Sequence, residues 1–230
     1  SPRTGMYCLR GTGCALAMLA DCDDSTTWGT QLLFARSETL QMVAVSPASD
    51  TISNIATTNT NDDPWLKVIF GDWVYWLDTI NGIVRLVSPQ AFYLGLKIQI
   101  GVENSALNKQ LPNVVGTQKS YLNQVYGPAD LQALAAARVD VITNPVPGGN
   151  YFGFRFGRNT SSNPVTHQDS YTTLTDYIAT TLNAGAGQFI GRTLSPREQR
   201  EAQSAISAYL DNMWAAGQIG NANGTIPYSV

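Results

Sequence analysis

Two apolar stripes at helical spacing are the clearest pattern along the chain, and both lie near its C-terminus. The first predicts a helix near 170–183. The second predicts a helix that begins at Pro196, with Ser195 as its cap and Glu198 completing a capping box, and that ends at Gly217. Seven residues form this second stripe: Ala202, Ala205, Ile206, Tyr209, Leu210, Met213 and Trp214.

The segment before these helices predicts a helix followed by two short strands. The helix covers 127–138, and the strands cover 139–143 and 151–157 on either side of a Pro/Gly turn. A helix with a single apolar face needs a surface to cover, so we expect the two C-terminal helices to pack on these strands. The pattern therefore predicts an α+β domain over 121–230.

The front half of the chain alternates between strand-like and helix-like segments. We expect strands 65–70 and 73–77 to be joined by Gly71-Asp72 in a hairpin-like junction, and 103–118 to be a long connecting loop. The other expected elements are short apolar runs at 6–9 and 15–20, a helix after 24–26, a strand at 41–45, and helices at 52–56 and after Ser88-Pro89. This order predicts an α/β domain over 1–120.

Composition adds a preference for buried interfaces. Charged residues make up 13% of the chain, whereas about 25% is usual in a soluble domain. Depletion of charge is typical of surfaces that pack against other protein. A neutral surface rich in Asn and Thr, without a special partner, is the alternative interpretation.

Charge and hydropathy exclude several classes of partner. The net charge of −3 and the absence of any Lys/Arg run argue against binding to nucleic acid. No apolar stretch reaches the roughly 18 residues of a membrane span. The start, 1–5, lacks an initiator Met and a signal-peptide layout, so we expect it to be the cut end of a longer protein.

Candidate metal and cofactor sites are weak. Cys8, Cys14 and Cys22 do not have zinc-ligand spacing, and we expect them to be free buried thiols in a reducing compartment. The run 9–15 contains the first two glycines of a dinucleotide fingerprint, but Leu16 stands where the third is needed. A plain turn is the preferred interpretation, so we predict no cofactor and no metal.

Candidate catalytic residues are equally sparse. A hydrolase triad could be assembled from His167, Asp169 and a serine, but no serine lies in an elbow motif. Carboxylate pairs such as Asp23-Asp24 and Asp62-Asp63 fit caps and turns, although a two-carboxylate glycosidase stays open in principle. We predict that the chain is not an enzyme. The alternative is a hydrolase that acts on carbohydrate or peptide.

Several runs of residues carry a family resemblance. They are Leu122-Asn123, 136–142 (Ala-Ala-Arg-Val-Asp-Val-Ile), Gly148-Gly149, 156–160 (Phe-Gly-Arg-Asn-Thr), 188–190 (Gln-Phe-Ile) and 209–219, which contains Met-Trp-Ala-Ala-Gly. With these runs, the stretch from about Tyr121 to Val230 resembles the C-terminal part of contractile tail sheath proteins of myovirus-type bacteriophages. The runs at 88–95 and 108–111 are similar to upstream segments of the same family. A run of arginines that the family shows is absent here.

The resemblance implies a fold and a function. Members have a subtilisin-like core without a catalytic triad, and their subunits stack into a helical sheath that contracts to drive a tail tube through the host envelope. It implies as partners copies of the chain itself, the tail tube and baseplate proteins. The location would be the virion tail, made in the host bacterial cytoplasm. Another tail or baseplate structural module is a further alternative.

The ends of the chain bear on how it would assemble. Family members use flexible terminal arms to add strands to neighbouring sheets. This chain stops at 226–230, where the family would begin its final strand, so we expect a trimmed core fragment that is largely monomeric. As possible contacts between subunits we name four arginines and two residues at the chain end: Arg155, Arg158, Arg192, Arg197, Tyr228 and Val230.

Overall fold

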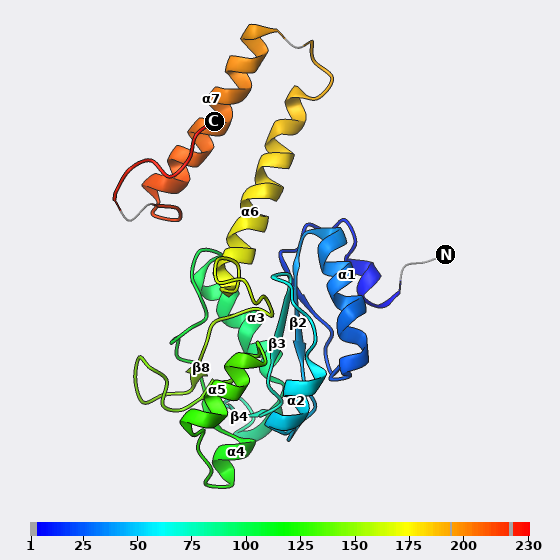
Figure 1. The fold of residues 1–230 in the computed structure, drawn as a ribbon, viewed down its shortest axis with the longest axis vertical. Coiled ribbons are helices and arrows are strands. Elements are labelled where there is room, and N and C mark those ends of the chain that lie inside the picture. The colour runs from blue at the N-terminus through cyan, green and yellow to red at the C-terminus, as the bar shows by residue number, and fades with distance from the viewer. Residues whose placement is uncertain (1–3, 194, 221–222) are drawn as a thin grey trace. The chain divides into compact units, whose positions relative to one another are not determined.

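The chain divides into two units in the computed structural model, Ser1–Asp176 and Tyr177–Val230 (Figure 1). The structure describes residues 4–193, 195–220 and 223–230. Of the start expected to be a cut end, 1–5, residues 1–3 lie outside the described residues. The boundary expected after residue 120 falls inside the first unit, within α4 (Gln118–Tyr121) and before α5 (Pro128–Ala136).

A parallel sheet forms the centre of the first unit. Its strands lie in the order β1 (Leu16–Met18), β2 (Gln41–Val45), β3 (Leu66–Ile69), and Asp140 extends it through a parallel bridge to Ile69. Every residue of β2 and β3 is buried. Burial on both faces explains why these strands are near-continuous apolar runs.

Helices cover both faces of this sheet. Side chains from α1 (Trp28–Glu38), α2 (Ile52–Thr58) and α5 pack with Met42 and Ala44 of β2 on one face. Side chains from α3 (Pro89–Ile100) pack with Val43 on the other. Successive residues of a strand point to opposite faces, so β2 belongs to both cores. Three layers of this kind are the α/β architecture predicted for the front half (Figure 1).

A second sheet corrects two expectations. It is antiparallel, in the order β5 (Ile83–Val87), β4 (Val74–Asp78), β6 (Val114–Thr117). The expected hairpin between 65–70 and 73–77 is wrong, because β3 and β4 belong to different sheets. The hairpin is β4–β5, and the Asp78 carboxylate accepts hydrogen bonds from two backbone N–H groups of its turn. β6 lies in the segment expected to be a loop.

The strands expected after α5 are present but shorter than predicted. They are β7 (Ile142–Thr143) and β8 (Gly153–Phe154), and they pair antiparallel. Three short 3-10 helices, η1 (Gly5–Leu9), η2 (Ser25–Thr27) and η3 (Gly187–Phe189), complete the elements. The mixed α+β class is confirmed.

The two predicted C-terminal helices are α6 (Asp169–Ala186) and α7 (Pro196–Ala215). The Ser195 hydroxyl accepts a hydrogen bond from the Glu198 N–H at 3.2 Å, as the capping signal predicts. The second unit holds α7 and the last part of α6, and its described residues contain no strand. The packing of both helices on a sheet, and the likeness of the core to subtilisin, stay predictions.

Candidate functional site

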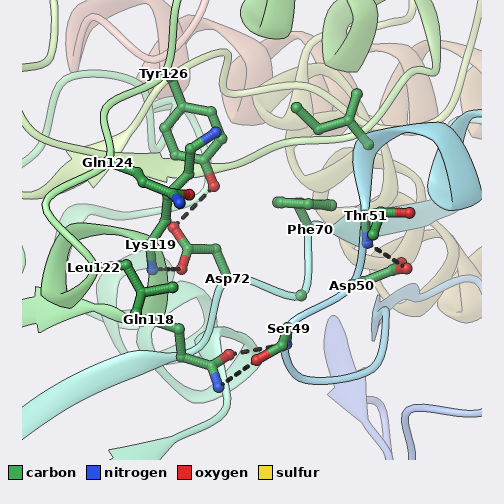
Figure 2. A pocket seen from close by; sticks show the side chains of 12 residues that line it. Ser49, Asp50, Thr51, Phe70, Asp72, Gln118, Lys119, Leu122, Gln124 and Tyr126 are labelled. Carbon is green, nitrogen blue, oxygen red and sulfur yellow. Dashed lines mark hydrogen bonds between the residues drawn. The ribbon is translucent and has the colours of Figure 1, made fainter.

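A pocket lies at the carboxyl ends of β2 and β3, and we call it the carboxyl-edge pocket (Figure 2). It is lined by residues of three segments, 49–52 after β2, 70–72 after β3, and 118–126 in and after α4. Its volume is about 320 Å³. The crevice beyond the carboxyl ends of parallel strands is where α/β folds generally bind ligands.

Close contact between two loops shapes one wall. A Cβ on Gly71 would lie 1.8 Å from the Pro47 carbonyl oxygen, so only glycine fits at this crossing. The Gly71 N–H donates to the Ser46 hydroxyl at 2.8 Å, and the Ser49 N–H donates to the Gly71 carbonyl at 2.9 Å. The loops after β2 and β3 are therefore held edge to edge.

Asp72 is the buried carboxylate of the pocket. It accepts hydrogen bonds from the Lys119 N–H and from the Tyr126 hydroxyl, each at 2.8 Å (Figure 2). Burial raises the pKa of Asp72 above its usual value, although these hydrogen bonds act against the shift. Burial, together with the charge of Asp72, also raises the pKa of the Tyr126 hydroxyl.

The remaining polar groups are Asp50, Gln118 and Lys119. The Gln118 amide holds the loop after β2 through bonds to the N–H and hydroxyl of Ser49, both at 2.9 Å. The Lys119 Nζ lies 4.2 Å from the centre of the Tyr126 ring and 3.2 Å from an oxygen of Asp130. Asp50 has one carboxylate oxygen that is buried and has no hydrogen-bond partner among the described residues. Among the described residues, the Tyr126 hydroxyl is the one lining hydroxyl that contacts a carboxylate, that of Asp72.

A second polar centre lies inside the first unit. The Lys67 side chain is fully buried, and its Nζ lies 2.6 Å from an oxygen of Asp140 and 3.8 Å from one of Asp169. It also donates to the Arg158 carbonyl at 2.7 Å and lies 4.5 Å from the centre of the Tyr93 ring. One feature of the sequence indicates this buried pair, a single charged residue inside each of two apolar runs, 66–69 and 139–142. The pair was not among the predicted sites.

Among the described residues, His167, Asp169 and a serine do not form the hydrolase triad that the sequence left open. The Ser105 hydroxyl donates directly to Asp169 at 2.7 Å, and the same carboxylate accepts from the Ala106 N–H at 3.2 Å. The His167 carbonyl accepts from the Asn159 N–H at 2.8 Å as part of a loop. A triad needs the histidine between serine and aspartate, whereas here the serine contacts the aspartate itself.

The glycine run 9–15 is a turn, as predicted. It follows η1 and leads into β1, whereas a dinucleotide fingerprint follows a strand and opens a helix. Gly11 and Gly13 both have positive φ, and the Gly11 N–H donates to a carboxylate oxygen of Glu38 at 3.1 Å. The Gly11 N–H is therefore already paired within the chain.

The cysteines are less buried than expected. Cys8 is exposed, while Cys14 and Cys22 are half-buried. Across the described residues, no group of three His, Cys, Asp or Glu side chains could hold a metal ion. In the same part of the chain, no helix is both long and apolar enough to cross a membrane.

The predicted contact residues are divided between the two units, with Arg155 and Arg158 in the first. Arg158 is committed to the interior of the first unit, where its guanidinium donates to the Ala135 carbonyl at 2.7 Å and to the Ser161 carbonyl at 3.1 Å. Burial lowers the pKa of Arg158. Arg155 is half-buried, and its N–H donates to the Val141 carbonyl at 2.9 Å.

The other four lie in the second unit, where each of them contacts a residue of α7. Arg192 pairs with Glu198 at 3.1 Å, and Arg197 pairs with Glu201 at 2.9 Å. The Tyr228 hydroxyl donates to Asp211, which raises the pKa of Tyr228 to about 12. The Val230 carbonyl accepts from the Gln203 amide at 2.6 Å. As contacts between subunits, all six stay predictions.

Comparison with known proteins finds similar structures but no similar sequences. No family model and no curated protein sequence matches the chain. Among solved structures, the chain is similar to the contracted sheath complex of an extracellular contractile injection system, PVC, with a TM-score of 0.71 and 16% identity over 90% of this chain and 56% of that one.

Two further structures come from the anti-feeding prophage, AFP. Its contracted helical sheath matches with a TM-score of 0.64 and 16% identity over 87% of this chain and 55% of that one. A chain of its baseplate matches with a TM-score of 0.61 and 15% identity over 86% and 51%. The chain therefore has the fold of contractile sheath proteins, and it spans about half the length of the chains it matches.

Proposed function

We propose that the chain is part of a structural subunit of a contractile sheath. The fold likeness carries this proposal, because it extends over 86–90% of the chain in structures that include two contracted sheaths. At 14–16% identity the likeness concerns architecture, and the role is our inference from it.

The mechanism of such a subunit is mechanical. Identical subunits joined by heterologous contacts that do not close build a helical tube. Contraction then moves folded units as rigid bodies between two packings. The first unit suits this role, since its two apolar clusters and buried Lys67 centre tie sheet and helices into one block.

The finer proposal follows from the resemblance in sequence. We assign the sheath to a myovirus-type bacteriophage tail that surrounds a tail tube, ends at a baseplate and penetrates the host envelope. Its partners are other copies of the chain, the tube and the baseplate, without nucleic acid or membrane. Its place is the virion tail, after synthesis in the host bacterial cytoplasm, and we assign it no enzymatic activity.

Electron microscopy of the complete gene product tests the sheath role. We expect hollow tubes with a regular helical repeat, formed either by the protein alone or on addition of its tube protein. Complete protein that stays dispersed at high concentration and never surrounds a tube would contradict the proposal. Tubes attached to a phage tail support the finer assignment, whereas release of a tail-like particle without a phage head points to an injection system.

A further inference from the structure

The buried Lys67 centre holds the three groups that an amide condensation needs: an amine, a carboxyl group that it can attack, and a second carboxylate that can carry a proton. The Lys67 Nζ lies 2.6 Å from Oδ2 of Asp140 and 3.8 Å from Oδ2 of Asp169, and none of the three side chains is exposed. The rings of Tyr93 and Phe154 have their centres 4.5 and 5.6 Å from the same nitrogen. Removal from water in an apolar site is one way in which a lysine becomes a nucleophile.

The charges of this centre favour the condensation. Two buried charges are costly to hold even when they are paired, and replacing such a pair with uncharged groups is often neutral or stabilising. An amide between Lys67 and Asp140 would replace both charges with one neutral group. Passage of a single proton from Nζ to Oδ2, across 2.6 Å, gives the neutral amine and neutral carboxyl group from which the reaction starts.

Backbone donors around Asp140 suit the transition state of this reaction. Oδ1 accepts from the Val141 N–H at 2.9 Å and from the Phe156 N–H at 3.0 Å. Two backbone N–H groups on one oxygen form an oxyanion hole, which stabilises the charge that develops there when a nucleophile adds to the carbon. Oδ2 faces Lys67 and accepts from the Gly157 N–H at 3.1 Å, and it is the oxygen placed to leave.

The product would fit the same contacts. The Lys67 Nζ donates to the Arg158 carbonyl at 2.7 Å, and an amide nitrogen keeps the one hydrogen that this bond needs. The amide oxygen, Oδ1, keeps both of its backbone donors. Asp169 remains held by the Ser105 hydroxyl at 2.7 Å and the Ala106 N–H at 3.2 Å. The surroundings therefore satisfy the amide without rearrangement of the backbone.

We propose that Lys67 and Asp140 condense in the folded chain to form an isopeptide bond, with Asp169 as the proton carrier. The neutral amine adds to Cγ of Asp140, and Oδ1 takes the negative charge. Asp169 accepts a proton from the nitrogen and passes it to the Oδ2 hydroxyl. The bond between Cγ and Oδ2 then breaks, one water molecule leaves, and Asp169 is again a carboxylate.

The bond would join two neighbouring segments of the central sheet. Lys67 lies in β3, and Asp140 extends the sheet through its bridge to Ile69 of the same strand. The segments are far apart in sequence, so the cross-link would also restrict the unfolded chain. This inference does not depend on the proposed function, although a cross-linked sheet suits a subunit that moves as a rigid body under load.

Mass spectrometry of the denatured complete gene product tests the bond directly. We expect an intact mass lower, by one water molecule, than the mass calculated from the sequence. Trypsin does not cleave after a lysine whose amine is acylated, so its digest should contain one branched species made of residues 37–85 and 139–155. An intact mass equal to the calculated one, with separate peptides 37–67 and 68–85, would overturn the inference.

Variants assign the roles. Lys67→Met should lack the branched species. Asp169→Asn keeps both reacting groups and removes the proton carrier, so we expect it to retain the water and to give separate peptides. Asp176→Asn alters another carboxylate of α6 and is the matched control, which should form the bond as the wild type does. A branched species in folded Asp169→Asn would overturn the role of Asp169, and loss of water that persists in Lys67→Met would show that the water comes from another site.

Discussion

Lys67 shows how one residue can determine the fit between sheet and helices. Its ammonium group is fully buried between Asp140 and Asp169, and it is stable there because a carboxylate, a carbonyl and an aromatic ring surround it. A buried charge whose partner is removed is left uncompensated. Lys67 therefore contributes to specific packing of sheet and helices only while its carboxylate partners, Asp140 and Asp169, are both present.

The first prediction concerns Asp140. Its carboxylate accepts from Lys67, from the Val141 N–H at 2.9 Å and from the Gly157 N–H at 3.1 Å. In an asparagine, the NH₂ group would replace one of these accepting oxygens and would face N–H groups that also donate. We expect Asp140→Asn to reduce the free energy of unfolding by about 3–5 kcal/mol, measured by urea denaturation. Asp130→Asn, which alters the partly exposed pair with Lys119, should cost about 1 kcal/mol or less. Equal effects of the two changes would contradict this account.

The second prediction concerns pH and Asp176. Its carboxylate accepts from the Trp65 indole N–H, 3.1 Å from each oxygen, and burial raises its pKa above 3.8. A raised pKa means that the folded state favours the protonated form, so stability is lost as pH rises through the folded pKa. Asp176→Asn keeps an acceptor for Trp65 without the charge. We expect its melting temperature, relative to wild type, to be higher at pH 8 than at pH 4. A difference that does not change with pH would refute this.

At the scale of elements, two glycines test two different effects: Gly95 tests helix propensity, and Gly71 tests steric fit. Gly95 lies inside α3 with no atom near its missing Cβ, whereas Gly71 crosses the Pro47 carbonyl at 1.8 Å from that position. We expect Gly95→Ala to stabilise the chain by about 0.5–1 kcal/mol. Gly71→Ala should destabilise it strongly, because backbone must move. Thermal unfolding of both variants checks this, and a stable Gly71→Ala protein would mean that the two loops can separate.

Elements with local signals could be predicted from the sequence, and their pairing could not. Pro196 and Pro89 both begin helices where the Ser-Pro signal placed them. β3 and β4 are adjacent in sequence but lie in different sheets, because long-range contacts decide sheet membership. β6 was missed because its four residues sit in a polar segment and it lies at a sheet edge.

The candidate site was beyond sequence reasoning for a related reason. Its lining comes from three segments separated by about 20 and 45 residues, and it exists only after the sheet and α4 have formed. Asp50 and Asp72 each look locally like a turn residue. The same holds for Arg158, which the sequence offers as a surface arginine and the structure places against the Ala135 and Ser161 carbonyls. Reversing its charge should therefore unfold the first unit before it tests assembly.

At the scale of the whole molecule, the last prediction concerns association. A stable interface usually buries about 1,200–2,000 Å² in total, and this chain spans 51–56% of the sheath and baseplate chains that share its fold. In the sheath family that its sequence resembles, neighbouring subunits are joined by added strands from terminal arms. A polypeptide of residues 1–230 would then meet its copies through side-chain contacts alone, which are weak one at a time. We expect it to be monomeric at micromolar concentration by size exclusion with light scattering, while the complete gene product forms tubes. Rings or tubes formed by residues 1–230 alone would show that core contacts are sufficient, and would place the assembly energy in the faces of the two units.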